Sequence, residues 1–182
     1  MSQIQTQQEL DDFYKNPDPW AYKSNPDDIR RRHELLACLP NNKYQRVLDI
    51  GCGNGFLTSQ LPGSEVIGVD LSASAVDWAK ESVSEVADSS RFKFQQASIF
   101  ELKSEKLGKF DLIIITGLLY KQYIGKSNSL IFEIIDDLLS AGGVLATCHI
   151  HNWNPPKFPY ALIDINLYQY RDYFHRLEIY KK

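Results

Sequence analysis

The stretch Val47-Leu48-Asp49-Ile50-Gly51-Cys52-Gly53-Asn54-Gly55 decides the fold of this 182-residue chain. Its apolar beginning predicts a short strand over 46–50, after which glycines stand at alternate positions. Glycine adopts positive φ without steric cost and lets a ligand approach the backbone closely. A short helix is predicted over 56–61. The order of strand, glycine turn and helix therefore predicts a ligand-binding turn.

Strands and helices alternate along the chain around this turn. The predicted helices span 27–39, 74–87 and 130–139, and the other predicted strands span 65–70, 91–96, 110–116, 144–150, 163–168 and 175–180. A turn is predicted over 141–143, and the first ~25 residues show no periodic pattern. The alternation predicts an α/β fold with a parallel, doubly wound sheet, whose binding crevice lies at the carboxyl ends of the strands.

The composition excludes several classes of protein. A hydrophobic fraction of 43% excludes a wholly disordered chain, and a formal charge of −3 argues against nucleic-acid binding through bulk charge. The longest apolar run, 112–120, is shorter than the ~20 residues of a membrane helix, and the polar N-terminus does not look like a secretory leader. Cys38, Cys52 and Cys148 form no CxxC spacing, which predicts reduced thiols and no metal site. We expect a cytoplasmic protein with neither a nucleic-acid nor a membrane partner.

Two classes of cofactor compete for the glycine turn. A dinucleotide fingerprint, GxGxxG/A, needs Gly or Ala where Phe56 stands, and the phosphate-binding pattern GxxxxGK[ST] is absent. Asp70 ends the next predicted strand, and a carboxylate there accepts two charge-assisted hydrogen bonds from a ribose diol. The observed pattern is D-x-G-x-G-x-G, from Asp49 to Gly55. A glycine turn without a ligand is the weaker interpretation beside Asp70.

This pattern resembles motif I of the class I S-adenosylmethionine-dependent methyltransferases, and the resemblance extends over residues 44–150. It implies a single doubly wound, Rossmann-like domain with a mainly parallel seven-stranded sheet whose last strand is antiparallel. It also implies S-adenosylmethionine as cofactor and S-adenosylhomocysteine as product. Residues 1–43 would form an N-terminal lid and helix region, 44–150 the cofactor-binding core, and 151–182 the C-terminal strands and an acceptor-side loop.

The same resemblance implies the residues of the cofactor site. Asp49, Gly51 and Gly53 would line the methionine part of the cofactor, and Asp70 would hold the ribose hydroxyls. Many family members carry Asp where Ser98 stands, so its hydroxyl is expected to bind the adenine more weakly. The further residues that match the pattern, beside the adenine or in the loop after the fourth strand, are Leu71, Ser98, Ile99 and Thr116.

A narrower resemblance lies upstream of the glycine turn. The element Asn16-Pro17-Asp18-Pro19-Trp20, followed by Arg30 and Leu39-Pro40, is similar to the nodulation protein S family, which N-methylates the free amino group of a chitooligosaccharide. The tail over 173–178 also looks like the end of such proteins. That family often has Glu where Asp49 stands here, so the resemblance implies the reaction more directly than the acceptor.

Several residues before the glycine turn are candidates for the cofactor site. Tyr14, Trp20 and Tyr22 form an aromatic lid over the cofactor in one interpretation and pack on the sheet edge in another. The guanidinium fork of Arg30 suits a methionine carboxylate, although Arg30 also belongs to a run of charges that solvent would surround. Its neighbours Arg31 and Arg32 are expected at the surface.

Three residues are candidates for catalysis: Tyr120, His149 and His151. The two histidines flank Ile150 and would share one face of a strand. Three interpretations apply to these histidines. In the first they line the acceptor pocket and one acts as general base, and in the second they bind a metal for which the sequence offers no third ligand. In the third they are polar residues at the end of a strand. Tyr120 follows the fourth strand and would orient the acceptor, or pack as a loop aromatic.

Three functions agree with these features. The first is an N-methyltransferase for a saccharide or other small molecule, and the second is an O-methyltransferase in polysaccharide or natural-product assembly. The third is a cofactor-binding regulator or partner subunit without catalytic activity.

No insertion long enough for a substrate lobe follows the fourth or fifth strand, so the acceptor site is expected to be open and shallow. We expect a monomer or a weak homodimer.

Overall fold

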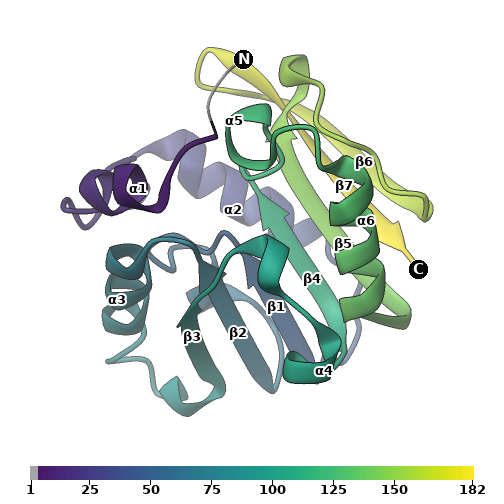
Figure 1. Ribbon diagram of the computed structural model, residues 1–182, viewed down its shortest axis with the longest axis horizontal. Helices are drawn as coiled ribbons and strands as arrows, with labels where there is room; N and C mark the ends of the chain where they lie inside the picture. The colour runs from purple at the N-terminus through teal and green to yellow at the C-terminus, as the bar shows by residue number, and fades with distance from the viewer. Residues whose placement is uncertain (1–3) are drawn as a thin grey trace.

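A seven-stranded sheet runs through the computed structural model, which describes residues 4–182 (Figure 1). The strands are β1 (Arg46–Ile50), β2 (Glu65–Asp70), β3 (Phe92–Gln96), β4 (Phe110–Thr116), β5 (Leu139–Ile150), β6 (Ala161–Tyr170) and β7 (Tyr173–Lys181). The helices are α1 (Gln7–Phe13), α2 (Pro26–Cys38), α3 (Ala73–Ser82), α4 (Ser104–Leu107), α5 (Lys121–Ile124) and α6 (Asn128–Leu138). No helix among these residues is long and apolar enough to cross a membrane.

The strand order is β3-β2-β1-β4-β5-β7-β6. Strands β1 to β5 pair in parallel, and β7 is antiparallel to both of its neighbours. Because the chain moves outward from β1 in both directions, the strand order reverses between β1 and β4, where such sheets bind ligands. The predicted doubly wound, mainly parallel sheet with an antiparallel last strand is confirmed.

The two faces of the sheet carry two separate hydrophobic cores, because alternate residues of each central strand point to opposite faces. In β4, Leu112 belongs to the core that contains Leu35 of α2. The next residue, Ile113, belongs to the core that contains Ile131 and Ile135 of α6. All five side chains are fully buried. This double burial explains why the central strands are continuous apolar runs.

The structure corrects three of the predicted local elements and adds α1. The helix predicted over 56–61 is a short 3-10 turn, Thr58–Gln60, and the turn predicted over 141–143 lies inside β5. The helix predicted over 74–87 ends at Ser82, whose hydroxyl donates to the carbonyl oxygen of Ala79, a local bond that competes with helical bonding. Helix α1 was not predicted, because none of its residues is buried and it therefore shows no apolar period.

Candidate active site

A cavity of about 380 Å³ opens at the carboxyl ends of β1, β2 and β4. One side is formed by residues that follow these strands and β3, namely Gly51, Asp70, Leu71, Ala97, Ile99, Thr116, Gly117 and Leu118. The other side comes from the N-terminal segment and α2, namely Gln5, Leu10, Phe13, Tyr14, Trp20, Tyr22 and Arg31. Residues 44–150 alone would therefore leave the cavity open on one side.

The glycine turn after β1 needs its glycines. Gly51, Gly53 and Gly55 all have positive φ, between +53° and +78°. The N–H of Gly53 donates to Oδ2 of Asp70 at 2.9 Å, so the turn is bonded to the end of β2. A Cβ atom on Gly53 would lie 2.7 Å from the hydroxyl oxygen of Tyr14. The end of β2 and the side chain of Tyr14 therefore both constrain the turn. Gly51 is the glycine of this turn that faces the cavity.

Asp70 presents a desolvated carboxylate to the cavity. Its Oδ1 accepts the N–H of Ser72 at 3.0 Å, and its Oδ2 accepts that of Gly53. Burial raises the pKa of Asp70, although these backbone hydrogen bonds act to lower it. Each carboxylate oxygen can accept a further hydrogen bond. Asp70 is therefore arranged to accept two donors from a ligand.

Asp49 lies beneath the glycine turn and does not line the cavity. Its Oδ2 accepts the hydroxyl of Thr58 at 2.6 Å, and burial raises the pKa of Asp49 to about 6. Its Oδ1 is buried without a hydrogen-bond partner among residues 4–182. A buried acceptor without a partner is destabilising, which leaves Oδ1 available to a donor from a ligand or a water molecule.

The N-terminal segment covers one side of the cavity and is bonded to α3 and to its N-cap residue, Ser72. The hydroxyl of Ser72 donates to Asp11 at 2.6 Å, and the indole N–H of Trp78 donates to the carbonyl oxygen of Tyr14 at 2.9 Å. The N–H of Gln5 donates to the carbonyl oxygen of Gln122 at 2.8 Å, so the chain before α1 meets α5. Tyr14, Trp20 and Tyr22 all line the cavity.

Arg30 and Arg31 of α2 lie opposite to the positions predicted for them from the sequence. Arg30 points away from the cavity, with half of its side chain exposed and an ion pair to Glu34. Arg31, expected at the surface, lines the cavity, and only 12% of its side chain is exposed. Consecutive helical residues lie about 100° apart, so only one of the two can face the sheet. Leu35, four residues after Arg31 and fully buried, is the signal that the sequence analysis missed.

The three catalytic candidates do not line the cavity. Nε2 of His149 accepts the N–H of Leu119 at 3.1 Å, and the hydroxyl of Tyr120 accepts the N–H of Ile150 at 2.8 Å. Strand β5 ends at Ile150, so His151 leaves the sheet and is exposed. The two histidines therefore do not share a strand face. Burial lowers the pKa of His149 to about 3 and keeps its ring neutral.

We expect His149 to make folding sensitive to acid. Its pKa is about 3 in the folded state, against 6.5 for an exposed imidazole, so the unfolded chain binds the proton first as pH falls below 6.5. Between pH 7 and pH 5 this lowers the free energy of unfolding by about 2 kcal/mol. Urea unfolding at both pH values should show a larger fall for the wild type than for His149→Gln. Equal falls in both proteins would contradict this role.

The remaining predicted residues fall into two groups. Leu71, Ile99 and Thr116 line the cavity, whereas Ser98 begins the next turn and its hydroxyl accepts the N–H of Phe100. The cavity residues that were not named individually from the sequence come from the chain before α1, from α1 and from α5, namely Gln5, Leu10, Phe13, Gln122 and Tyr123. Thr6 and Glu9 form a capping box, the pattern that could have revealed α1. Within residues 4–182, no group of three His, Cys, Asp or Glu side chains is placed to hold a metal ion.

Comparison with known proteins decides the family. A methyltransferase-domain model matches residues 41–169. The chain belongs to this methyltransferase family. It is 33% identical over 133 residues to a trans-aconitate 2-methyltransferase of Paracidovorax citrulli, covering 70% of this chain and 48% of that protein. It is 31% identical over 135 residues to a ubiquinone biosynthesis O-methyltransferase of Nitrosococcus oceani, covering 73% and 52%. The chain thus spans about half the length of these curated relatives.

The methyltransferase fold extends over nearly the whole chain. The N-methyltransferase NodS from Bradyrhizobium japonicum, solved in complex with S-adenosyl-L-homocysteine, superposes with a TM-score of 0.81. The match covers 96% of this chain and 97% of NodS at 19% sequence identity. The resemblance to class I S-adenosylmethionine-dependent methyltransferases is confirmed, and the narrower resemblance to the nodulation protein S family is confirmed at the level of the fold.

The cavity of this chain fits S-adenosylmethionine chemically. Asp70 offers acceptors to a ribose diol, and Leu71 and Ile99 offer apolar surface to a purine. Arg31 offers a guanidinium to a carboxylate. A volume of about 380 Å³ is within the range of sites for ligands of this size. Donor, apolar and acceptor groups therefore stand along one continuous cavity.

Proposed function

We propose that the chain transfers a methyl group from S-adenosylmethionine to an amino group of a saccharide or other small molecule. The observation that carries this proposal is the cavity between Asp70 and Arg31. These oppositely charged groups stand beside the glycine turn of a methyltransferase fold. The bound cofactor would supply a methyl group on a positively charged sulfur. The chain's own residues would hold the cofactor, exclude water and align the acceptor.

We assign the following roles to the cavity residues. Asp70 accepts hydrogen bonds from the ribose hydroxyls, and Leu71 and Ile99 contact the adenine. Arg31, in place of Arg30, binds the methionine carboxylate, and Gly51 lets the cofactor approach the backbone. The other cavity residues with an assigned role are Thr116 near the reacting sulfur and Tyr14, Trp20 and Tyr22 as the lid. Asp49 and Gly53 support the glycine turn from below.

The surroundings of the catalytic candidates favour an amine acceptor over a hydroxyl. A hydroxyl acceptor needs a base, whereas an unprotonated amine needs only alignment. The hydroxyl oxygen of Tyr120 and Nε2 of His149, the atoms proposed to act on the acceptor, already accept backbone N–H groups, and His151 is exposed. The alternative O-methyltransferase is supported by the similarity to a ubiquinone biosynthesis O-methyltransferase. A regulator without catalytic activity would bind the cofactor but transfer nothing.

We also propose that three successive segments of the chain have different roles. Residues 1–43, of which 1–3 lie outside the described residues, cover the cofactor, 44–150 bind it, and 151–182 contribute to the acceptor side. The lining of the cavity by α1 and Arg31 supports the first part. Trp153, whose ring centroid lies 4.8 Å from that of Tyr120, supports the last.

A transfer assay tests the proposed function. Purified protein and radiolabelled S-adenosylmethionine are incubated with deacetylated chitooligosaccharides, with monomeric amino sugars and with the N-acetylated forms of both. We expect label in the free amines and none in the acetylated controls, with a rate that rises with pH as the amines lose their protons. Label in the hydroxyl-bearing controls would support the O-methyltransferase instead. Cofactor binding without transfer to any acceptor would support the regulator.

A further inference from the structure

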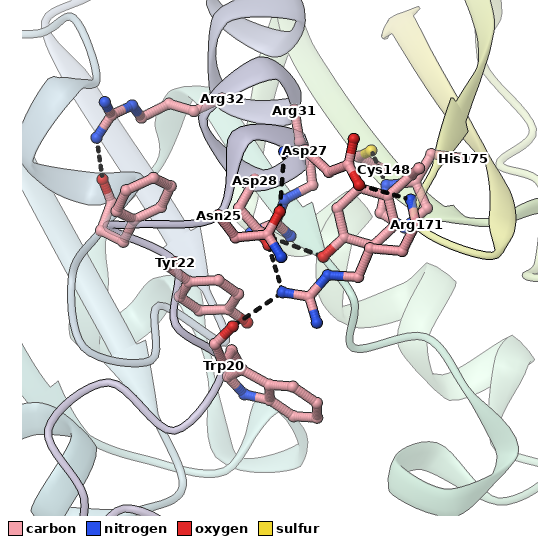
Figure 2. A network of polar contacts seen from close by, with 12 residues as sticks. Trp20, Tyr22, Asn25, Asp27, Asp28, Arg31, Arg32, Cys148, Arg171 and His175 are labelled. Carbon is pink, nitrogen blue, oxygen red and sulfur yellow. Dashed lines mark hydrogen bonds and ion pairs between the residues drawn. The ribbon is translucent and has the colours of Figure 1, made fainter.

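The turn between β6 and β7 is bonded to α2 and to the segment before it, and Arg171 makes most of the contacts (Figure 2). Its Nη2 donates to the carbonyl oxygen of Trp20 at 2.8 Å and forms an ion pair with Asp28 at 2.5 Å. Its backbone N–H donates to Asp27 at 3.1 Å, and the hydroxyl of Tyr170 donates to Asp28 at 2.7 Å. A hairpin at the far end of the chain therefore holds part of the cavity wall.

Two residues at this contact adopt a left-handed backbone that non-glycine residues rarely use. Arg171 has a φ of +50° and Ala21 a φ of +56°. Such strain persists only where surrounding contacts hold it, commonly beside functional sites. Ala21 stands between Trp20 and Tyr22, which line the cavity and whose ring centroids lie 6.4 Å apart. The contacts of Arg171 thus help to hold the aromatic wall.

One buried carboxylate forms ion pairs with two guanidinium groups at this contact. Asp28 is fully buried, and it lies 3.3 Å from Arg31 and 2.5 Å from Arg171. Arg31 lines the cavity and Arg171 does not. The other nearby carboxylate, Asp27, accepts the backbone N–H of Arg171. Because Asp28 is shared, it neutralises Arg31 only in part and leaves positive charge at the cavity wall.

We infer that Arg171 is a positioning residue for the carboxylate of the cofactor. It draws Asp28 towards the hairpin, which leaves the guanidinium of Arg31 available to the ligand, and it holds Trp20 against the cavity. Without Arg171, Asp28 would pair with Arg31 alone and would compete with the ligand carboxylate. The inference rests on the proposed function, because it takes the ligand to be S-adenosylmethionine.

Two ligands separate this role from general support of the fold. S-Adenosylhomocysteine carries the carboxylate, whereas 5′-methylthioadenosine has the same nucleoside and sulfur without it. Calorimetry should show that Arg171→Gln weakens S-adenosylhomocysteine binding roughly tenfold, the size of one charge-assisted hydrogen bond, and 5′-methylthioadenosine binding by less than about twofold. Arg171→Lys keeps the positive charge and should retain most of the affinity. Arg30→Gln, which removes an arginine outside the cavity, is the matched control and should change neither value.

Equal losses for both ligands would overturn the inference, because Arg171 would then only support the fold. No loss for either ligand would overturn it as well. Amide hydrogen exchange of residues 18–24 in the ligand-free protein adds a readout that needs no ligand, and we expect faster exchange in Arg171→Gln than in the wild type. Unchanged exchange would contradict the contact with Trp20. Faster exchange in a protein that binds no S-adenosylhomocysteine would confirm that contact while overturning the ligand role and the proposed function together.

Discussion

Replacing Asp70 with alanine is expected to weaken S-adenosylhomocysteine binding about 30-fold or more. The change removes a carboxylate that lines the cavity and is placed to accept charge-assisted hydrogen bonds, a loss of about 2 kcal/mol. It also removes the acceptors of the Gly53 and Ser72 amides, so the glycine turn loses its bond to the end of β2. Isothermal titration calorimetry of both proteins measures the effect directly.

Two further variants separate the carboxylate from the fold. Asp70→Asn keeps the shape and one acceptor oxygen, so its loss of affinity should be smaller than that of Asp70→Ala. Asp77→Ala removes an exposed carboxylate of α3 whose partner is Lys80, and it should bind like the wild type. Unchanged affinity in a folded Asp70→Ala protein would refute the assignment of Asp70 to the ribose.

Replacing Arg31 with glutamine is expected to weaken S-adenosylhomocysteine binding by roughly 10- to 100-fold. A hydrogen bond to a charged group is worth about 1.5–3 kcal/mol, and Arg31 is the arginine of α2 that faces the cavity. Binding of 5′-methylthioadenosine should change far less, since it has no carboxylate for Arg31 to bind. Calorimetry with both ligands gives the comparison.

Arg30→Gln is the control for this experiment. It removes the same kind of side chain one position earlier on α2, where the partner is the partly exposed Glu34. Its affinity for both ligands should equal that of the wild type. A larger loss in Arg30→Gln than in Arg31→Gln would restore the original expectation from the sequence and contradict the observed orientation of α2.

The parts of the fold that depend on burial could be predicted from the sequence. The predicted limits of β2 and β4 coincide with the observed ones, because strands buried on both faces are continuous apolar runs between polar residues. Helix α1 could not be found in this way. It is exposed, and what fixes its place is the bonds of Asp11 and Tyr14 to Ser72 and Trp78, more than sixty residues later in the chain.

The residues of the candidate site also fall into two groups, those placed by the local sequence and those placed by tertiary packing. Gly51 and Asp70 could be recognised because local backbone geometry and strand ends place them, whatever the rest of the chain does. The choice between Arg30 and Arg31 depends on the rotation of α2 against the sheet, which the buried Leu35 reports. The hydrogen bond of His149 to Leu119 depends on how the loop after β4 packs against the end of β5, so no local pattern could separate a pocket histidine from a structural one.

We propose that the cavity beneath the N-terminal segment binds the methyltransferase cofactor. Titration of S-adenosylhomocysteine into the wild-type protein in a calorimeter measures this binding. We predict saturable binding of one ligand per chain in the micromolar range, typical of small-molecule sites, and loss of that affinity in Asp70→Ala. No binding at millimolar ligand to the folded protein would contradict the assignment of this cavity to the cofactor.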